Sequence, residues 1–435
     1  MSTLTESLPR RTFCLVTLLA ALAIAAPVRS QAPAASSSAQ ATISVERLAR
    51  LDAFIERHVN ERRIAGGVML VAQHGRIVHL RSFGKLDVDR GVPMSDTALF
   101  RIASMTKAIT SVAVMQLVED GSLLLSDPVA KYLPAFTNTT VAVLPTSGSS
   151  GGMSTVPAKR PITIRHLLTH TAGISYGTGP LEAQYKAAGV FGWYCADRDE
   201  TMGAMVDRLA ALPFEAHPGE RWVYGFGTDI LGRVVEVVSG LSLDEYFRRH
   251  IFEPLKMRDT FFFVPPEKSA RLATVYSAQA DGTIARAPEQ GSAGQGAYVV
   301  GPRKCFSGGA GLVSTITDYA RFLQMLLDGG SLDGARVLSP ASVASMTSNH
   351  VGSLYSDGDL GFGLGFEVVD HLGRAGRLGA VGEFNWGSAY YPDYWVDPAH
   401  GVVAIFMTQL IPAGGLDLSA RIKSLVYQAI ETQRF

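Results

Sequence analysis

The sequence has few cysteines and no excess of charge of either sign, and both features exclude classes of protein. Its three cysteines are widely separated along 435 residues, too few for a disulfide scaffold and too scattered for a zinc site. Lysine plus arginine and aspartate plus glutamate each total 39, so no global field favours nucleic acid or anionic membranes. The charges are also mixed along the chain, without the basic stripe of a nucleic-acid-binding protein.

The composition is that of a globular protein with a substantial core. Hydrophobic residues make up 47% of the chain and charged residues 18%. The length allows two or three domains, or one large unit with insertions. The carboxylates show no clustered pattern, so we expect neither a metal nor a cofactor.

Residues 1–30 have the parts of an export signal. Arg10 and Arg11 form a basic region, and the uncharged run Phe13–Ala26 is too short to span a bilayer. Small or β-branched residues up to Ser30 suit a signal peptidase, so we predict cleavage after Ser30. The paired arginines also resemble a twin-arginine signal. An N-terminal membrane anchor is the alternative, although no second apolar segment supports it.

Removal of the signal leaves a periplasmic or secreted chain with two cysteines. Residues 31–42, which contain much alanine and serine, are predicted as a flexible linker. Cys195 and Cys305 then meet an oxidising compartment, where they could form a disulfide. Two free, buried thiols are an equal alternative, because the sequence does not show whether their Cα atoms approach.

Apolar residues recur at helical or alternating spacing through residues 43–435, which we predict to form the folded part of the chain. Helices are predicted at 44–60, 104–119, 202–212, 227–240, 243–250 and 417–431, and strands at 67–72, 77–80, 362–369, 394–397 and 401–407. Tight turns join the strands, which come from both chain ends. We therefore predict an α+β fold with one antiparallel sheet built from both ends and flanked by helices. A Ser/Gly-rich patch at 146–155 is predicted as a surface insertion.

Two G-x-S-x-G matches invite comparison with the nucleophile elbow of α/β-hydrolases. That elbow requires a tight turn from a strand into a helix, with the serine exposed above a sheet. Ser150 lies in the Ser/Gly patch with no strand before it, and Ser175 follows a helical stretch and leads into a loop. We interpret both as chance matches in glycine-rich loops.

The sequence also contains two S-x-x-K matches, and the predicted secondary structure around each distinguishes them. Ser82 and Lys85 end a strand with a glycine between them, so no helix presents them on one face. Ser104 and Lys107 begin a long apolar helix, where residues three apart share a face and the amine can reach the hydroxyl. The helix dipole there favours negative charge on the serine oxygen. The alternative is a serine N-cap with a solvated lysine.

A lysine acts as a base near neutral pH only if its surroundings lower its pKa, so a second proton carrier is expected. Tyr224 follows Trp222 on a glycine-flanked turn just before a predicted helix. A tyrosine there is otherwise a core residue with a satisfied hydroxyl. Residues 383–389 are predicted as a strand in which Gly387 lets a ligand approach the backbone.

With the serine–lysine pair, the tyrosine and the Trp-Gly strand in this order, the chain resembles the serine β-lactamase and penicillin-binding-protein superfamily. Within it, the chain is most similar to the family VIII carboxylesterases, which are class C β-lactamase-like esterases. Three further stretches extend the resemblance over nearly the whole mature chain: Leu167–Gly173, Ser307–Leu312 and Trp395–Pro398.

The resemblance implies a fold and a division of labour. Ser104 attacks the substrate, and Lys107 and Tyr224 move the proton. The N–H groups of Ser104 and Ala389 bind the oxyanion, and an acyl-enzyme forms and is then hydrolysed.

The resemblance also implies two parts of the chain with the active site in the cleft between them. An α/β part covers about 43–125 and 300–435, and a helical part covers about 126–299.

The chain departs from the β-lactamase pattern at two motifs. Phe226 replaces the asparagine of Tyr-x-Asn, and Trp386-Gly387-Ser388 replaces Lys-Thr-Gly. The lost amide and ammonium are groups that would hold a β-lactam, whereas an aromatic wall favours an uncharged, apolar acyl or alcohol group. We therefore predict that these four residues bind substrate, although Ser388 also departs from the esterases' usual Trp-Gly-Gly. His371 could belong to a His-x-Gly variant of the motif, but it is predicted in a hairpin turn.

We accordingly predict an exported serine carboxylesterase that acts on short- to medium-chain acyl esters. The expected partner is a small-molecule ester, with no nucleic acid and, after signal removal, no membrane. A β-lactamase, D-amino-acid peptidase or penicillin-binding protein is the first alternative, and weak β-lactam turnover beside esterase activity is compatible with the main prediction. A non-catalytic cell-wall-binding module is the second alternative, which the intact serine, lysine and tyrosine argue against.

Overall fold

A computed structural model describes residues 41–144 and 152–432. The predicted signal peptide, most of the predicted linker and Ser150 of the first G-x-S-x-G match lie outside these residues. No helix in the described part is long and apolar enough to cross a bilayer.

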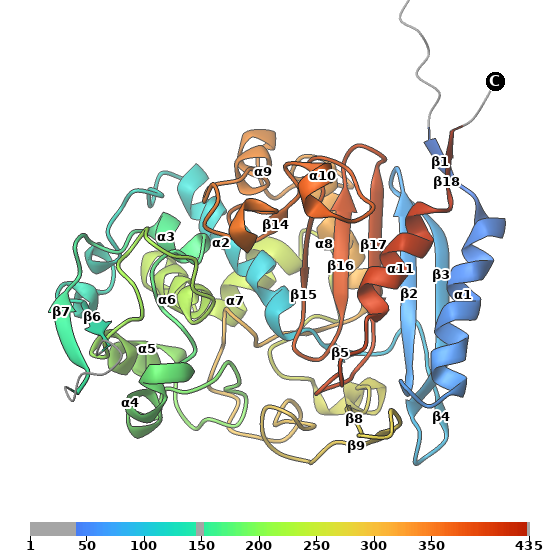
Figure 1. Cartoon of the computed structure of the whole chain (residues 1–435), viewed down its shortest axis with the longest axis horizontal. Helices are drawn as coiled ribbons and strands as arrows, with labels where there is room; N and C mark the ends of the chain where they lie inside the picture. Colours follow the sequence, from blue (N-terminus) through green and yellow to red (C-terminus); the bar gives the residue numbers. More distant parts are fainter. Residues whose placement is uncertain (1–40, 145–151, 433–435) are drawn as a thin grey trace, which may run out of the picture.

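The centre of the molecule is an antiparallel sheet of eight strands that both chain ends build, as the sequence predicts (Figure 1). In spatial order the strands are β13 (Gly361–Phe362), β14 (Glu367–Val368), β15 (Phe384–Gly387), β16 (Asp393–Asp397), β17 (Val402–Met407), β2 (Gly66–Gln73), β3 (Arg76–Asp87) and β4 (Val92–Pro93). The two halves of the chain join where β17 pairs with β2. Both of these strands are buried along their whole length, so they read as continuous apolar runs.

Five short two-stranded pairs are also present in the described residues, separate from this sheet. They are β1 (Ala41–Ile43) with β18 (Ile430–Thr432), β5 (Phe100–Arg101) with β10 (Val313–Ser314), β6 (Thr140–Val143) with β7 (Ser154–Pro157), β8 (Tyr276–Ala278) with β9 (Ile284–Arg286) and β11 (Ser331–Leu332) with β12 (Ala335–Arg336). β1 begins at Ala41, inside the range predicted as linker, because it pairs with a strand at the opposite chain end. A sequence pattern of three residues gives no sign of such a distant pairing.

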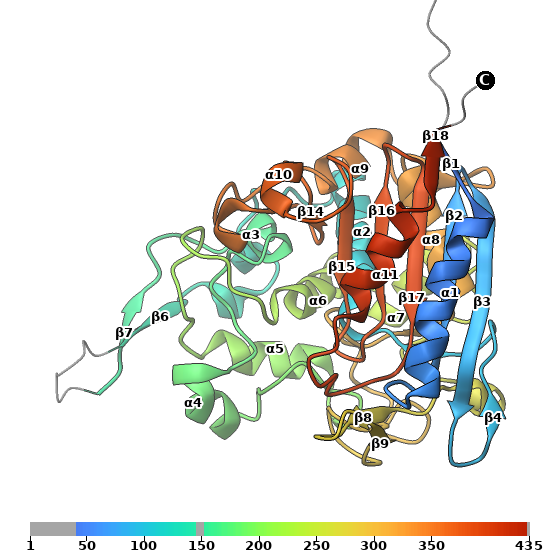
Figure 2. The same ribbon diagram turned by 45° about the vertical axis from the view of Figure 1, so that its right-hand side comes forward.

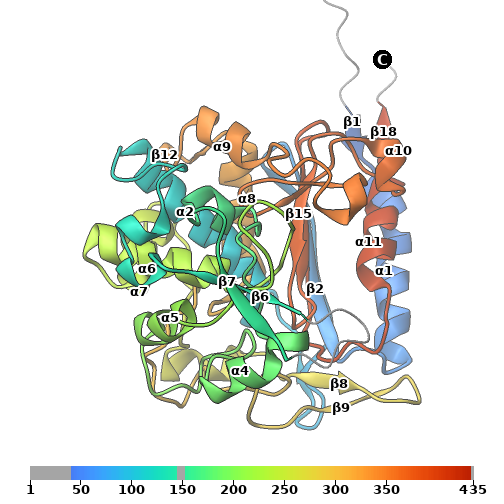
Figure 3. The same cartoon turned by 60° about the vertical axis from the view of Figure 1, so that its left-hand side comes forward.

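Helices cover both faces of the sheet. α1 (Val45–Asn60) and α11 (Leu418–Tyr427) lie side by side on one face, and α8 (Ile316–Leu327) lies on the other (Figures 2 and 3). The remaining helices are α2 (Thr106–Glu119), α3 (Ile164–Leu168), α4 (Glu182–Ala187), α5 (Met202–Ala210), α6 (Gly227–Ser239), α7 (Leu243–Phe247), α9 (Pro340–Met346) and α10 (Leu372–Ala375). The predicted α+β, β-lactamase-like fold is therefore confirmed, while the boundaries between its two parts stay a prediction.

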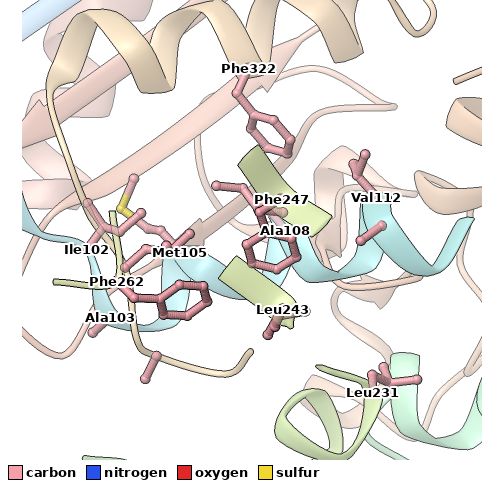
Figure 4. Close-up of a cluster of buried hydrophobic side chains, with 14 of the residues drawn as sticks. Ile102, Ala103, Met105, Ala108, Val112, Leu231, Leu243, Phe247, Phe262 and Phe322 are labelled. Carbon is pink, nitrogen blue, oxygen red and sulfur yellow. The ribbon is translucent and has the colours of Figure 1, made fainter. Parts of the chain in front are cut away.

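α2 is mostly apolar and is buried on all sides along nearly its whole length, so it forms the inner core rather than a surface helix. Figure 4 shows Phe247 from α7 and Phe262 beside its first turns, with Met105 at its start. The predicted helix at 104–119 begins two residues later than predicted, because Ala103–Met105 forms a 3₁₀ turn (η1) before α2 starts at Thr106.

Other predicted elements are shorter in the structure. The predicted strand at 362–369 is two strands, β13 and β14, separated by a tight turn. His371, predicted in a hairpin turn, is the N-cap of the short helix α10, which lies within the connection from β14 to β15. Cys195 and Cys305 are both free and buried, which decides between the two alternatives for these thiols.

Buried polar groups fasten α11 to the sheet. Glu383 is fully buried and accepts a hydrogen bond from Lys423 of α11. The Tyr427 hydroxyl, also from α11, lies 2.7 Å from carboxylate oxygens of both Glu383 and Asp397. The opposite charge and the hydrogen bonds offset part of the cost of burying these carboxylates.

The buried carboxylate of Asp393 in β16 has fewer stabilising partners than Glu383 and Asp397 have. One of its carboxylate oxygens is buried without a hydrogen-bond partner. Burial raises the pKa of this carboxyl from 3.8 to about 6, against the opposing effects of Ser419 and the charge of Lys423. The folded protein therefore binds this proton more tightly than the unfolded chain does, and ionised Asp393 destabilises the fold.

We predict that Asp393→Asn stabilises the protein at pH 8 by up to about 3 kcal/mol, since each pKa unit corresponds to about 1.4 kcal/mol. The gain is complete above pH 6 and disappears as the pH falls through 6 towards 4, where wild-type Asp393 is already neutral. Urea unfolding at pH 4 to 8 measures the gain, with the exposed Asp89→Asn as control. A variant no more stable than wild type at pH 8 would contradict this account.

Candidate active site

Ser104 and Lys107 meet at the junction between a short strand and the buried helix. β5 ends at Arg101, the η1 turn carries Ser104, and Lys107 lies in the first turn of α2. The Lys107 Nζ lies 3.5 Å from the Ser104 Oγ, so residues three apart do share a face as the spacing predicts. Ser104 is half-buried, while Lys107 is only 1% exposed.

Oxygens from three separate segments surround the Lys107 amino group. Besides Ser104 Oγ, it lies 3.0 Å from the Tyr176 hydroxyl and 2.8 Å from the Gly309 carbonyl. A carbonyl only accepts, so one N–H of Lys107 must point to Gly309, which fixes the orientation of the group.

Asp229 fixes the position of that carbonyl. Its Oδ1 accepts hydrogen bonds from the Gly309 N–H at 3.0 Å and from the Ser307 hydroxyl at 2.5 Å. Burial raises the pKa of the Asp229 carboxyl, which Ser307 and the charge of Lys107 oppose. Ser307–Leu312 had supported the resemblance, and the structure gives Gly309 in that stretch a direct role at the lysine.

Tyr224 reaches the site on the loop that precedes α6. A Cβ added at Gly225 would lie 2.3 Å from the Ile174 carbonyl oxygen, so only glycine allows this loop to approach the segment that carries Tyr176. The Tyr224 ring lies 4.5 Å from Lys107 Nζ, and its hydroxyl accepts a hydrogen bond from the Trp386 indole N–H at 3.3 Å. Tyr224 therefore contacts both the amine and the Trp-Gly strand.

Tyr176 is a site residue that the sequence reasoning missed. It is almost fully buried, and burial raises the pKa of its hydroxyl well above 10, so it stays neutral beside Lys107. The only sequence signal is that it follows Ser175 inside the second G-x-S-x-G match. Ser175 itself is buried and accepts a hydrogen bond from the Gly177 N–H, which indicates a turn-forming role.

A cavity of about 460 Å³ opens beside Ser104. Aromatic side chains of Tyr176, Trp193, Tyr224 and Trp386 line it. Gly387, the last residue of β15, completes the wall together with Ser388 and Ala389, and the Ala389 N–H has no hydrogen-bond partner among the described residues. An oxyanion site requires free backbone N–H groups at the same cavity as the serine, and Ala389 lies at that cavity.

The predicted role of Phe226 in substrate binding is wrong. Its side chain is 1% exposed, does not line the cavity and packs against the Tyr176 ring with centroids 4.8 Å apart. The position that corresponds to the missing asparagine thus faces the core. The aromatic wall exists, but other residues form it.

Charged and amide groups form the opposite end of the cavity. Arg377 donates to Glu367 at 2.5 Å, and the Asn385 amide donates to the same carboxylate at 3.1 Å. The arginine is therefore already paired, unlike the free ammonium that Lys-Thr-Gly would supply.

One H-x-x-x-H spacing, His166 and His170, does occur in the sequence and could suggest a metal site. His166 caps α3, where its Nδ1 accepts from the Thr163 N–H. His170 packs against Tyr224, and burial lowers its pKa well below 6.5, as does the charge of Lys107. No group of three or more histidine, cysteine or carboxylate side chains in the described residues could hold a metal ion.

Comparisons with known proteins identify this arrangement. The Beta-lactamase family matches residues 51–424, which is most of the chain. The chain belongs to this family. The predicted serine hydrolase is confirmed at this level.

Relatives and solved structures support the same assignment. Esterase EstB of Burkholderia gladioli is 33% identical over 379 residues, which cover 83% of this chain and 90% of EstB. Protein Rv1367c of Mycobacterium tuberculosis is 34% identical over 380 residues, 82% of this chain and 89% of that protein. The structure of EstCE1 superposes with a TM-score of 0.76 at 28% identity and covers 88% of this chain and 99% of EstCE1. The resemblance to family VIII esterases is therefore confirmed.

The two tyrosines are expected to contribute unequally to catalysis. Tyr224→Phe should lower kcat about 10³-fold, in the range for loss of a general acid–base group. Tyr176→Phe should lower kcat about tenfold, because it removes one hydrogen bond to the amine. Steady-state kinetics with a 4-nitrophenyl ester across pH 6 to 10 measures both.

Tyr185→Phe is the matched control, because Tyr185 is also buried and its hydroxyl donates to the backbone carbonyl of Pro213. It should leave the pH profile of kcat unchanged, whereas Tyr176→Phe should shift it. Equal losses in Tyr176→Phe and Tyr224→Phe would show that the two hydroxyls act as one unit.

Proposed function

We propose that the protein is an exported serine carboxylesterase that hydrolyses short- to medium-chain acyl esters through an acyl-enzyme on Ser104. The observation that carries the proposal is the contact of Ser104 Oγ with the buried Lys107 amine at the edge of an aromatic cavity. The similarity to Esterase EstB and to EstCE1, a hydrolase with promiscuous acyltransferase activity, supports an ester substrate.

In the proposed reaction, Ser104 Oγ attacks the ester carbonyl carbon, and its proton passes to the Lys107–Tyr224 pair. The N–H groups of Ser104 and Ala389 stabilise the oxyanion of the tetrahedral intermediate. That intermediate expels the alcohol, which takes up the proton from the pair. Water then attacks the acyl-enzyme in the same way, and the acid leaves as Ser104 regains its proton.

The contacts of the two tyrosines favour Tyr224 as the residue that transfers the proton and Tyr176 as the residue that positions Lys107. Tyr224 is half-buried beside the cavity, and its oxygen accepts from Trp386 while a cationic side chain faces its ring; both stabilise negative charge that develops on the oxygen. Tyr176 stays neutral because burial raises the pKa of its hydroxyl, so it serves to hold Lys107.

The chemistry of the cavity favours uncharged esters over β-lactams. Its cation, Arg377, is paired with Glu367, so a substrate carboxylate would have to compete with a protein carboxylate. The apolar aromatic wall instead contacts an acyl chain or a ring without unpaired polar groups.

Covalent modification of Ser104 is the first expected result. After exposure to a fluorophosphonate, intact-protein mass spectrometry should show one adduct, and peptide mapping should locate it on Ser104. The adduct should be absent from Ser104→Ala. The kcat/KM for 4-nitrophenyl butyrate should exceed that for a chromogenic cephalosporin at least a hundredfold. An adduct on Ser175, or faster cephalosporin turnover, would overturn the proposal, and no adduct would favour a binding module.

Export predicts a new N-terminus. Expression of the full chain in a Gram-negative host should yield periplasmic protein that begins at Gln31, as measured by N-terminal sequencing. Replacement of Arg10 and Arg11 by lysine should block export if the signal is of the twin-arginine type. Full-length protein that stays with the membrane fraction would instead support the N-terminal anchor.

A further inference from the structure

A second cavity, of about 900 Å³, lies between α11 and the connection from β14 to β15. Figure 2 shows the elements around it, with α10 above β15 and α11 across β16. Leu372 and Leu378 of the connection, Trp395 of β16 and Ala420 of α11 line it with apolar surface. The proposed reaction assigns no role to this cavity.

This cavity adjoins the catalytic one. Four residues line both cavities: Arg377, Asn385, Trp386 and Gly387. Trp386 is also hydrogen-bonded to Tyr224, so the shared wall is in direct contact with the catalytic residues.

The β15 edge between the cavities is open. β14 pairs only with Phe384 and Asn385, which leaves the following residues of β15 without a neighbour on that side. A Cβ added at Gly387 would come no closer than 3.9 Å to any atom, so packing does not demand glycine there. The missing side chain instead leaves space at the place where the two cavities meet.

The second cavity suits an uncharged apolar group. Its two cations are already paired, Arg377 with Glu367 and Lys423 with Glu383. Asp393 also lines the cavity, has one carboxylate oxygen without a hydrogen-bond partner among the described residues, and would repel a substrate carboxylate. Leu372 and Leu378 are 42% and 54% exposed, and two exposed leucines beside one cavity are typical of a ligand-binding surface rather than of ordinary solvent-facing chain.

We propose that this cavity is a subsite for the apolar acyl chain or alcohol body of an ester whose carbonyl lies at Ser104. The inference rests on the proposed esterase function and extends its substrates beyond what the catalytic cavity holds alone. A short ester fills the catalytic cavity only, whereas a longer one crosses the β15 edge and buries its additional methylenes against Leu372 and Leu378.

Two variants test the subsite without disturbing the core, because both positions are exposed. Leu378→Glu places a carboxylate in the cavity, and Ala420→Trp fills it with an apolar ring. In each variant the ratio of kcat/KM for 4-nitrophenyl octanoate to that for 4-nitrophenyl acetate should fall about tenfold. A second series compares acetates of 4-nitrophenol with acetates of larger ring alcohols.

Leu124→Glu is the matched control, because Leu124 is 55% exposed and lines neither cavity. It should leave every ratio unchanged. A fall in the acyl series assigns the subsite to the acyl chain, and a fall in the alcohol series assigns it to the alcohol. Unchanged ratios in both variants and both series, with acetate still hydrolysed, would overturn the subsite, whereas no acetate turnover by wild type would overturn the esterase function itself.

Discussion

The structure of the site depends on the burial of one amino group. Lys107 is almost completely removed from water, and a buried ammonium without partners would cost several kcal/mol. Its three partners are the Ser104 hydroxyl in the preceding turn, the Tyr176 hydroxyl in a loop, and the Gly309 carbonyl. Gly309 lies 202 residues further along the chain. The lysine is therefore satisfied only when these three segments converge, so the same contacts that stabilise it also align the serine.

Two residues near Lys107 shape its surroundings without contacting its amino group: Gly225 and Asp229. Gly225 allows the Tyr224 loop to touch the Tyr176 segment, and without that approach the two tyrosines could not lie on either side of the amine. Asp229 lies one step further out and holds Gly309, so its buried carboxylate acts on the lysine through a backbone carbonyl. Part of the electrostatics around Lys107 thus comes from Asp229, a group that does not line the substrate cavity.

The sequence could predict what depends on local periodicity and not what depends on long-range contact. The spacing of Ser104 and Lys107 on a helix is a local property, and so are the short apolar runs that identify strands such as β2 and β17. Tyr176 contacts Lys107, 69 residues away, and Asp229 contacts Gly309, 80 residues away. Contacts at such separations produce no periodic pattern in the sequence. The prediction that Phe226 binds substrate is wrong for a related reason. A sequence motif shows which residue occupies a position, but not whether its side chain points to the cavity or to the core.

Trp386 links recognition of the substrate to catalysis. Its indole N–H donates to Tyr224, which fixes the oxygen that we assign to proton transfer, and its ring forms part of the wall of both cavities. A lysine at this position, as in the Lys-Thr-Gly motif, would place a flexible charge where the chain now has a rigid apolar surface with one donor. The exchange removes the group that attracts a carboxylate and keeps a hydrogen-bond donor for the tyrosine. In the proposed reaction, a tryptophan at this position of β15 therefore favours apolar esters and leaves the proton-transfer pair in place.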